Sequence, residues 1–371
     1  MLKGELFHAH GTEHRPGLPP PNGQIVNQPT GIADPARSDI STPLCFTTAL
    51  VEKVWGGQSL RHLLQHSLPR EATYGEAWDI SSLPDHISRV ADGTHIGRTL
   101  TEVWNTIRHG CHCDEASTDS DFPLLIKWLD CQGWLSVQVH PNDTMARAVL
   151  GQRWGKSEAW VVIEAEPTSR IFAGLRPGIS QGLLMYHVNK GTIHECLHSF
   201  TPRRGDCIAL PAGTIHAAGG GLLIAEVQQS SNATFRLFDW NRTGPEGLSR
   251  SLQIDLALDA INWSQGAINP ILPQTIECTN DGVREEFLVE LPAFSLSRYM
   301  ITQTWPAPHS DILTIWMVLE GAVRLTDPRS GEVRDISRGR TVLIPANTSR
   351  MFWTPIGSEI QSTLLCIRLP R

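Results

Sequence analysis

The sequence lacks a hydrophobic run long enough to cross a bilayer, since no stretch of about 18 consecutive apolar residues occurs in it. Its first residues, MLKGELFHAHGTEH, also lack the apolar core of a secretory signal. We therefore expect a cytoplasmic protein. A basic excess is missing too, because the formal net charge is −7. Binding of nucleic acid needs a basic face that neutralises phosphates, so the charge argues against a nucleic-acid partner.

Paired cysteines are also missing. The eight cysteines stand singly, apart from the Cys111-His112-Cys113 triplet, and no CxxC pair or disulfide framework is present. We interpret them as reduced thiols. The triplet makes a poor zinc site because no second pair accompanies it, and the tail histidines His8, His10 and His14 are expected to be solvated.

The hydrophobic residues that are present lie in short runs. Residues 1–42 are rich in Pro, Gly and Asn and show no periodicity, which predicts a flexible tail. From Leu44 onward, runs such as WLSVQVH, EAWVVIEA and TIWMVLEG alternate with Gly, Pro and Asn. Short strands at this spacing are typical of a mainly β protein, either a barrel or a sandwich, with few helices.

Two stretches share an outline of strand, Gly turn and strand ending in Pro: RRGDCIALPAG at 203–213 and SRGRTVLIPAN at 337–347. This similarity predicts two barrels. The segment between them contains a helical pattern and a Pro-containing linker, which indicates a boundary near residues 265–285. We expect a first domain at 43–265 and a second at 266–371.

Candidate metal ligands lie in the first of these domains. In WLSVQVH the alternation places Ser136, Gln138 and His140 on one face of a strand. Glu158 opens a second strand, and His216 follows a Pro-Ala-Gly turn at the end of a third. Two imidazoles, a carboxylate and an amide oxygen suit zinc or another divalent cation with an open coordination position.

The residues around His216 carry a recognisable pattern, because Gly205, Pro211, Gly213 and His216 have the spacing of the second cupin motif. Longer segments resemble the type I mannose-6-phosphate isomerases in their compact form. They are FPLLIKWLD (122–130), LSVQVHPND (135–143), GKSEAWVVI (155–163), GDCIALPAGTIHA (205–217) and EVQQSSNATFRLFDWNR (226–242), with a weaker match at YGEAWDIS (74–81).

The resemblance implies two cupin (jelly-roll) barrels and the interconversion of mannose 6-phosphate and fructose 6-phosphate, a sugar-phosphate partner, and one Zn²⁺ per chain. It places the metal on Gln138, His140, Glu158 and His216, the four residues that the strand pattern also selects. The second barrel carries Asn347 and Ser349 after its proline and no histidine, so it is expected to bind no metal.

Lysine is scarce, with five in the chain, so the positions of the few are informative. Lys156 lies two residues before Glu158, on the same face of a strand. Lys127 interrupts an apolar run, where a buried ammonium needs an anionic partner such as a substrate phosphate or oxyanion. Arg236 likewise interrupts an apolar stretch, and the resemblance places a functional arginine there. We predict Lys127, Lys156 and Arg236 as catalytic residues.

The identity of the proton-transferring group is left open. Related isomerases often carry an acid where this chain has Asn232, and a histidine where it has Gly155. An amide cannot accept the proton, so water activated by the metal is the first choice, with Glu226 and Asp239 as alternatives. Other functions stay open as well: a metal-dependent oxygenase, a non-catalytic sugar-phosphate-binding cupin, or an isomerase of a related sugar phosphate.

Overall fold

The computed structural model describes residues 40–64, 72–108, 121–243, 247–276, 282–308, 311–346, 348–357 and 361–370. Asp39–Arg371 form one compact unit. Nearly all of the expected tail, the Cys111-His112-Cys113 triplet and Asn347 lie outside the described residues. Within the described ranges, no helix has the length and apolar character needed to cross a membrane.

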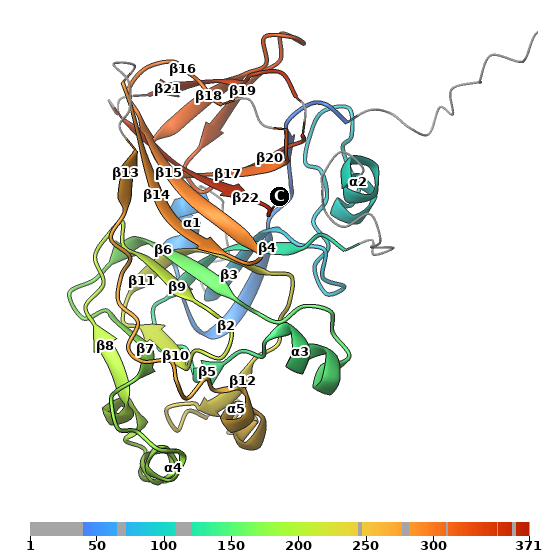
Figure 1. Ribbon diagram of the computed structural model, residues 1–371. Coiled ribbons are helices and arrows are strands. Elements are labelled where there is room, and N and C mark those ends of the chain that lie inside the picture. Colours follow the sequence, from blue (N-terminus) through green and yellow to red (C-terminus); the bar gives the residue numbers. More distant parts are fainter. Residues whose placement is uncertain are drawn as a thin grey trace, which may run out of the picture. The chain divides into compact units, whose positions relative to one another are not determined.

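The prediction of a mainly β protein with few helices is confirmed. Two antiparallel sheets are built from the chain up to residue 238 (Figure 1). The six-stranded sheet has the order β2 (Ala49–Gly57), β3 (Tyr74–Ile80), β4 (Leu124–Cys131), β11 (Leu222–Gln229), β6 (Glu158–Ala165) and β9 (Cys207–Leu210). The five-stranded sheet has the order β12 (Phe235–Phe238), β5 (Val137–Val139), β10 (His216–Gly219), β7 (Arg170–Leu175) and β8 (Leu197–Phe200).

Two further sheets contain the C-terminal strands. The seven-stranded sheet has the order β1 (Leu44–Cys45), β20 (Thr341–Ile344), β17 (Thr314–Glu320), β22 (Ser362–Arg368), β15 (Phe294–Ile301), β14 (Val283–Leu291) and β13 (Gln274–Ile276). The four-stranded sheet has the order β16 (Trp305–Pro306), β21 (Phe352–Ile356), β18 (Ala322–Thr326) and β19 (Val333–Ser337). Because β1 pairs with β20, an N-terminal strand belongs to a C-terminal sheet. The division into two barrels at 265/266 stays a prediction.

The helices are short and lie in the connections. They are α1 (Ser59–Leu64), α2 (Leu100–Ile107), α3 (Asp143–Met145), which continues into a π-helical turn (Ala146–Leu150), α4 (Gln181–Lys190), a 3₁₀ turn (Ile193–Cys196) and α5 (Ile254–Ala260). Helix α5 falls inside the helical pattern expected near the boundary, and it packs against β12 and β5 (Figure 1). Helix α5 therefore packs against the two strands that carry the predicted site residues Gln138 and Arg236.

The six-stranded sheet has two chemically different faces. On β4, Ile126 and Trp128 enter a buried core that also contains Ile315 and Leu365 of the seven-stranded sheet. Lys127, which lies between them, points to the opposite face because successive side chains on a strand alternate. That face packs on the five-stranded sheet. Polar residues on this second face therefore lie in the space between the six- and five-stranded sheets.

Candidate metal centre and its cavity

The register of the five-stranded sheet brings three predicted residues into one row. Gln138 on β5 pairs with His216 on the neighbouring β10 and with Arg236 on β12 at its other side. Val137 and Val139, the neighbours of Gln138 along β5, are buried in the core between this sheet and α5. The side chains of this strand thus alternate between its two faces as the sequence predicted. The strand order places Arg236, Gln138 and His216 side by side.

His140 follows β5 and is tied to the turn before His216. Its carbonyl oxygen accepts a hydrogen bond of 2.9 Å from the Gly213 N–H. Gly213 has a φ of +88°, and a Cβ there would lie 3.1 Å from the Ala260 carbonyl oxygen. Only glycine adopts this conformation readily. The glycine of the motif therefore holds the two histidine-bearing segments together.

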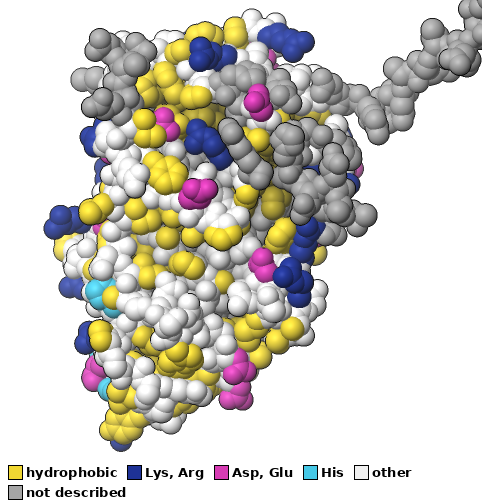
Figure 2. All heavy atoms as spheres, viewed as in Figure 1, with side chains coloured by type: hydrophobic (Ala, Val, Ile, Leu, Met, Phe, Trp, Pro, Cys, Tyr) yellow, Lys and Arg dark blue, Asp and Glu magenta, His cyan; other side chains and the backbone are white. Residues whose placement is uncertain are grey.

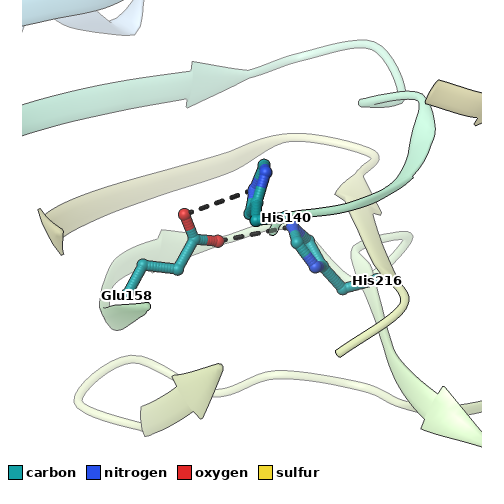
Figure 3. Close-up of side chains that lie close together, drawn as sticks. All are labelled: His140, Glu158 and His216. Atoms are coloured by element: carbon teal, nitrogen blue, oxygen red, sulfur yellow. Dashed lines mark ion pairs between the residues drawn. The ribbon is translucent and has the colours of Figure 1, made fainter. Parts of the chain in front are cut away.

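His140, Glu158 and His216 converge, with ligand atoms all within 4.8 Å of one another. Figure 3 shows both imidazole rings directed at the Glu158 carboxylate. The Nε2 atoms of His140 and His216 lie 3.6 Å and 3.3 Å from its oxygens. Each Nδ1 lies against a carbonyl oxygen, that of Ala233 at 2.8 Å and that of Thr214 at 2.9 Å. A carbonyl only accepts, so each Nδ1 carries the proton and donates it.

This arrangement fits a cation. With Nδ1 protonated, each neutral ring directs its Nε2 lone pair at the Glu158 oxygens, and a positive charge among these atoms relieves their repulsion. Lys156 Nζ, 3.1 Å from both His140 Nε2 and Glu158 Oε2, supplies part of that charge, and a cation among the three donors would supply the rest. Burial is the main cause that lowers the pKa of His140 and His216, which keeps the rings neutral. Neither Glu158 oxygen accepts an aligned hydrogen bond from a described residue. Burial raises the pKa of Glu158, and a bound cation opposes that effect.

Gln138 and Lys156 lie at the edge of this triad. The Gln138 amide nitrogen is 3.3 Å from His216 Nε2, and its oxygen accepts from the Ser136 hydroxyl. An amide flip would present the oxygen to a metal instead. Lys156 Nζ lies 3.1 Å from both His140 Nε2 and Glu158 Oε2. The predicted fourth ligand and the predicted lysine therefore both border the donor atoms.

Gly155 is fixed by packing. A Cβ at this position would lie 2.5 Å from the Pro141 carbonyl oxygen, and the Lys156 N–H donates to that same oxygen at 3.0 Å. The residue directly before Lys156 can therefore carry no side chain in this backbone. The histidine that may stand here in related enzymes has no room in this chain.

A second charged group lies on the neighbouring strands. Lys127 Nζ is 3.2 Å from Glu226 Oε2 and 3.7 Å from Glu76 Oε2, and it lies over the Trp78 ring. Burial alone would lower the pKa of Lys127, but Glu76 and Glu226 outweigh it and raise the pKa. The pKa of Glu226 is lowered although burial opposes this, because Lys127 and then Lys156 stabilise its charge. A buried anionic partner of Lys127 was expected, but the expected partner was a substrate phosphate or oxyanion, whereas the structure pairs Lys127 with two carboxylates of the chain itself.

Lys53 on β2 extends this group to the rim of the cavity. Its Nζ lies 3.2 Å from Glu76 Oε1, and its stem passes over Gly75, where a Cβ would lie 2.6 Å from that of Lys53. Neither Lys53 nor Glu76 was selected from the sequence. The signals available were the scarcity of lysine and the weak YGEAWDIS match, which contains Glu76.

Arg236 lies beside a segment that the sequence did not select. Its Nη1 donates to the Ser251 carbonyl oxygen at 2.9 Å, and its backbone pairs with Gln253. Arg236 Nε is buried and finds no acceptor among the described residues. Burial and the nearby charge of Arg250 lower the pKa of Arg236. Two guanidinium groups therefore lie close together here.

A cavity of about 290 Å³ borders these groups, and Gln138 and Lys156 line it beside the triad, whereas His140, Glu158 and His216 are not among its lining residues. Its lining residues come from both sheets and from the segment after β12: Lys53, Trp55, Glu76, Lys127, Leu129, Leu135, Ser136, Gln138, Lys156, Trp160, Glu226, Asn232, Thr234, Arg236, Arg250 and Gln253. Asn232 is exposed, at the rim. Asp239, an alternative base, is not among the lining residues. On the face drawn in Figure 2, charged side chains of both signs are scattered, whereas inside the cavity they are concentrated.

A buried His-Glu-His group between antiparallel sheets can hold a metal ion and fits the cupin class of proteins. Residues 44–157 match the family model of the catalytic domain of type I phosphomannose isomerase. The chain is 32% identical to the mannose-6-phosphate isomerase of Streptococcus mutans over 77% of this chain and 88% of that protein. It is 30% identical to mannose-6-phosphate isomerase ManA of Bacillus subtilis, over 82% and 93%. The chain belongs to the mannose-6-phosphate isomerase family.

Solved structures agree on the fold. The mannose 6-phosphate isomerase from Bacillus subtilis superposes with a TM-score of 0.79 at 29% identity, covering 88% of this chain and 99% of that one. A putative mannosephosphate isomerase from Archaeoglobus fulgidus has a TM-score of 0.68 at 20% identity and shows the fold alone. The expectation drawn from the sequence motifs is confirmed at the level of the family.

Proposed function

We propose that this protein interconverts mannose 6-phosphate and fructose 6-phosphate, with one divalent cation, zinc by preference, held by His140, Glu158, His216 and Gln138. The observation that carries the proposal is the row of His216, Gln138 and Arg236 across three adjacent strands. Gln138, next to the His-Glu-His group, and Arg236 both line one cavity. A substrate that fits both has an oxygen for the metal at one end and an anion at the other.

The size and polarity of the cavity suit such a substrate. Its 290 Å³ is close to the lower end of the range for small-molecule pockets, about 300 Å³. Most of its lining side chains are polar or charged, and Trp55 and Trp160 supply apolar surface. Sugar hydroxyls both donate and accept hydrogen bonds, so alternating lysines and glutamates can pair with them.

The reaction moves a proton between C2 and C1 of the open-chain sugar and needs a base as well as positive charge near O1 and O2. A bound divalent cation supplies part of that charge. Lys127 and Lys156 supply the rest from the chain. Glu226 is the base we propose, ahead of water activated by the metal, because its carboxylate lines the cavity beside Lys127, whereas Asp239 does not line it. The Trp160 N–H donates to the other oxygen of Glu226 at 2.8 Å and fixes its orientation.

Phosphate recognition is assigned to the other end. Arg236, Arg250 and Gln253 line the cavity next to one another and offer several N–H donors. Guanidinium groups match the oxygens of a phosphate in pairs. This separation leaves the reacting carbons near the metal and the lysines.

A conversion assay tests the proposal. The purified protein is incubated with mannose 6-phosphate, and in parallel with glucose 6-phosphate, allose 6-phosphate and unphosphorylated mannose. Preparations as purified, stripped with a chelator, and reloaded with Zn²⁺ or other divalent ions are compared by NMR. We expect fructose 6-phosphate from mannose 6-phosphate, loss on stripping and recovery on reloading. Binding without conversion would favour the non-catalytic alternative, and faster turnover of another sugar phosphate would favour a related isomerase.

A further inference from the structure

Asp239 forms an ion-pair cluster next to the cavity. It follows β12 and is 6% exposed. Its carboxylate accepts from Arg242 Nη2 at 2.5 Å, from Arg250 Nε at 2.8 Å and from Arg250 Nη2 at 2.5 Å. Burial alone would raise the pKa of Asp239, but the two arginines outweigh it and hold the pKa below its ordinary value. Asp239 is therefore ionised at neutral pH.

The chain makes an unusual turn to place this carboxylate. Trp240 and Asn241 have φ values of 56° and 55°, in the left-handed region that non-glycine residues seldom occupy. Two contacts hold the turn against the segment that precedes β5. Trp240 Nε1 donates to the Leu135 carbonyl oxygen at 2.6 Å, and Arg242 Nη1 donates to that of Trp134 at 2.5 Å. The position of Asp239 is thus fixed from both sides.

Arg250 is the member of the cluster that reaches the cavity. It engages Asp239 through one edge of its guanidinium group, Nε and Nη2. Nη1 takes no part in that contact. Arg250 lines the cavity together with Arg236, and its charge contributes to the lowered pKa of Arg236, which shows that the two groups repel each other. Without an anion behind it, Arg250, which is 29% exposed, is free to turn toward solvent.

The charges at this end do not balance. Among the described residues of this cluster, Arg236, Arg242 and Arg250 carry three positive charges against the negative charge of Asp239, which leaves an excess of two. A phosphate monoester carries nearly two negative charges at neutral pH. The Asp239 carboxylate thus pairs with Arg242 and Arg250 but does not neutralise the positive charge of the cluster.

We propose that Asp239 is a positioning residue that holds Arg250 at the cavity wall beside Arg236, so that both guanidinium groups bind the phosphate of the substrate. The proposal rests on the proposed function for the identity of the anion. It reassigns Asp239 from proton transfer to phosphate recognition, because its carboxylate is occupied by arginines and does not line the cavity.

The test compares Asp239→Asn, Asp239→Glu, Arg250→Gln and the double variant Asp239→Asn/Arg250→Gln in the full chain. Asp335→Asn is the matched control, because Asp335 also pairs with both Nε and Nη2 of an arginine, Arg324, but on the exposed β18–β19 hairpin. Three quantities are measured for each: kcat and KM for mannose 6-phosphate, the inhibition constant of inorganic phosphate, and the melting temperature.

We expect Asp239→Asn to raise KM and the phosphate inhibition constant about 10-fold, with kcat within about three-fold of wild type. Asp239→Glu should restore part of the loss, and Asp239→Asn should add little once Arg250 is Gln. Asp335→Asn should leave both constants unchanged. The proposal is overturned if Asp239→Asn lowers the melting temperature but leaves KM and the phosphate inhibition constant unchanged. It is also overturned if the increases in KM caused by the two single substitutions add up in full in the double variant.

The outcome also separates this proposal from the proposed function. A wild type that binds inorganic phosphate but does not isomerise mannose 6-phosphate overturns the proposed function alone. Direct titration of inorganic phosphate into wild type and Asp239→Asn then still tests the role of Asp239. A wild type that binds neither mannose 6-phosphate nor inorganic phosphate overturns both.

Discussion

The two ends of the cavity differ in their balance of positive and negative side chains. At the metal end, three lysines (Lys53, Lys127 and Lys156) face three glutamates (Glu76, Glu158 and Glu226), and all except Lys53 are buried. Their formal charges cancel when Glu158 is ionised, a state that a bound cation favours because burial raises the pKa of Glu158. At the arginine end, three arginines face one aspartate, and Arg242 and Arg250 are about a quarter exposed.

This difference indicates that one end of the cavity acts on the reacting carbons and the other binds the anion of the substrate. Balanced charges in a water-poor region act strongly on a reacting group and attract little from solution. An unbalanced positive group near solvent attracts and anchors an anion. Changes at the metal end should therefore lower kcat, whereas changes at the arginine end should raise KM. The row of His216, Gln138 and Arg236 links the two ends at a fixed spacing.

The largest effect is expected from removing two metal ligands. His140→Ala combined with His216→Ala, in a chain with His8, His10 and His14 replaced by Ala, should reduce the metal content from about one equivalent to nearly none. Because the cation contributes several kcal/mol to transition-state stabilisation, kcat/KM should fall by about 1,000-fold or more. Metal analysis and the conversion assay measure both.

The control for this change is His198→Ala, because the described contacts of His198 are with the exposed Asn269 and with Phe200 and include no residue of the triad. It should keep its metal and its activity. A full equivalent of metal retained in the double variant would place the metal elsewhere and remove His140 and His216 from the site.

Replacement of the proposed base comes next. Glu226→Gln should lower kcat roughly 300-fold, since a positioned general base contributes about 100-fold to 10,000-fold. KM should change little, because we propose that phosphate binds at the other end. Glu164→Gln is the control, since Glu164 is an exposed residue on β6 that pairs with Arg338. A kcat that is unchanged in Glu226→Gln assigns proton transfer to another group.

At the arginine end, Arg236→Ala should lower kcat/KM for mannose 6-phosphate by about 100-fold, because a guanidinium contact to an anion is lost. The residual activity toward unphosphorylated mannose should stay the same. Arg324→Ala, at an exposed ion pair, serves as the control. Equal losses with both sugars would mean that Arg236 acts on the reacting carbons and not on the phosphate.

The smallest effect is expected at Asn232, where related enzymes often carry an acid. Asn232 is exposed at the rim, whereas Glu226 is buried beside both lysines. Asn232→Asp should therefore change kcat by less than about three-fold. A large rise in kcat would show that the missing carboxylate is the base and that the wild type works without it.

Much of the metal end could be predicted from the sequence. Alternation along WLSVQVH predicted that Gln138 and His140 project together, and the spacing from Gly205 to His216 predicted the turn that returns the second histidine. Each of these signals is local, since it depends on neighbours within about ten residues. Lys127 and Lys156 were visible for the same reason, as charges in otherwise apolar runs.

The rest depends on contacts between distant segments. Glu76 and Lys53 reach the cavity because β2 and β3 pair beside β4, and this strand order cannot be read from periodicity. Arg250 lies in a connection without regular structure and was not distinguished from other surface arginines. Asp239 was recognised as a carboxylate near the site, but its arginine partners were not, so it was grouped with the bases.

The most direct test of the whole account is solvent exchange at C2. Mannose 6-phosphate is incubated in D₂O with the metal-loaded wild type and followed by ¹H NMR. We predict that fructose 6-phosphate forms and that deuterium enters the sugar at the transferred position, with both processes absent in metal-stripped protein and restored by Zn²⁺. A wild type that binds mannose 6-phosphate but neither exchanges the C2 proton nor forms fructose 6-phosphate would contradict the account and indicate a binding protein.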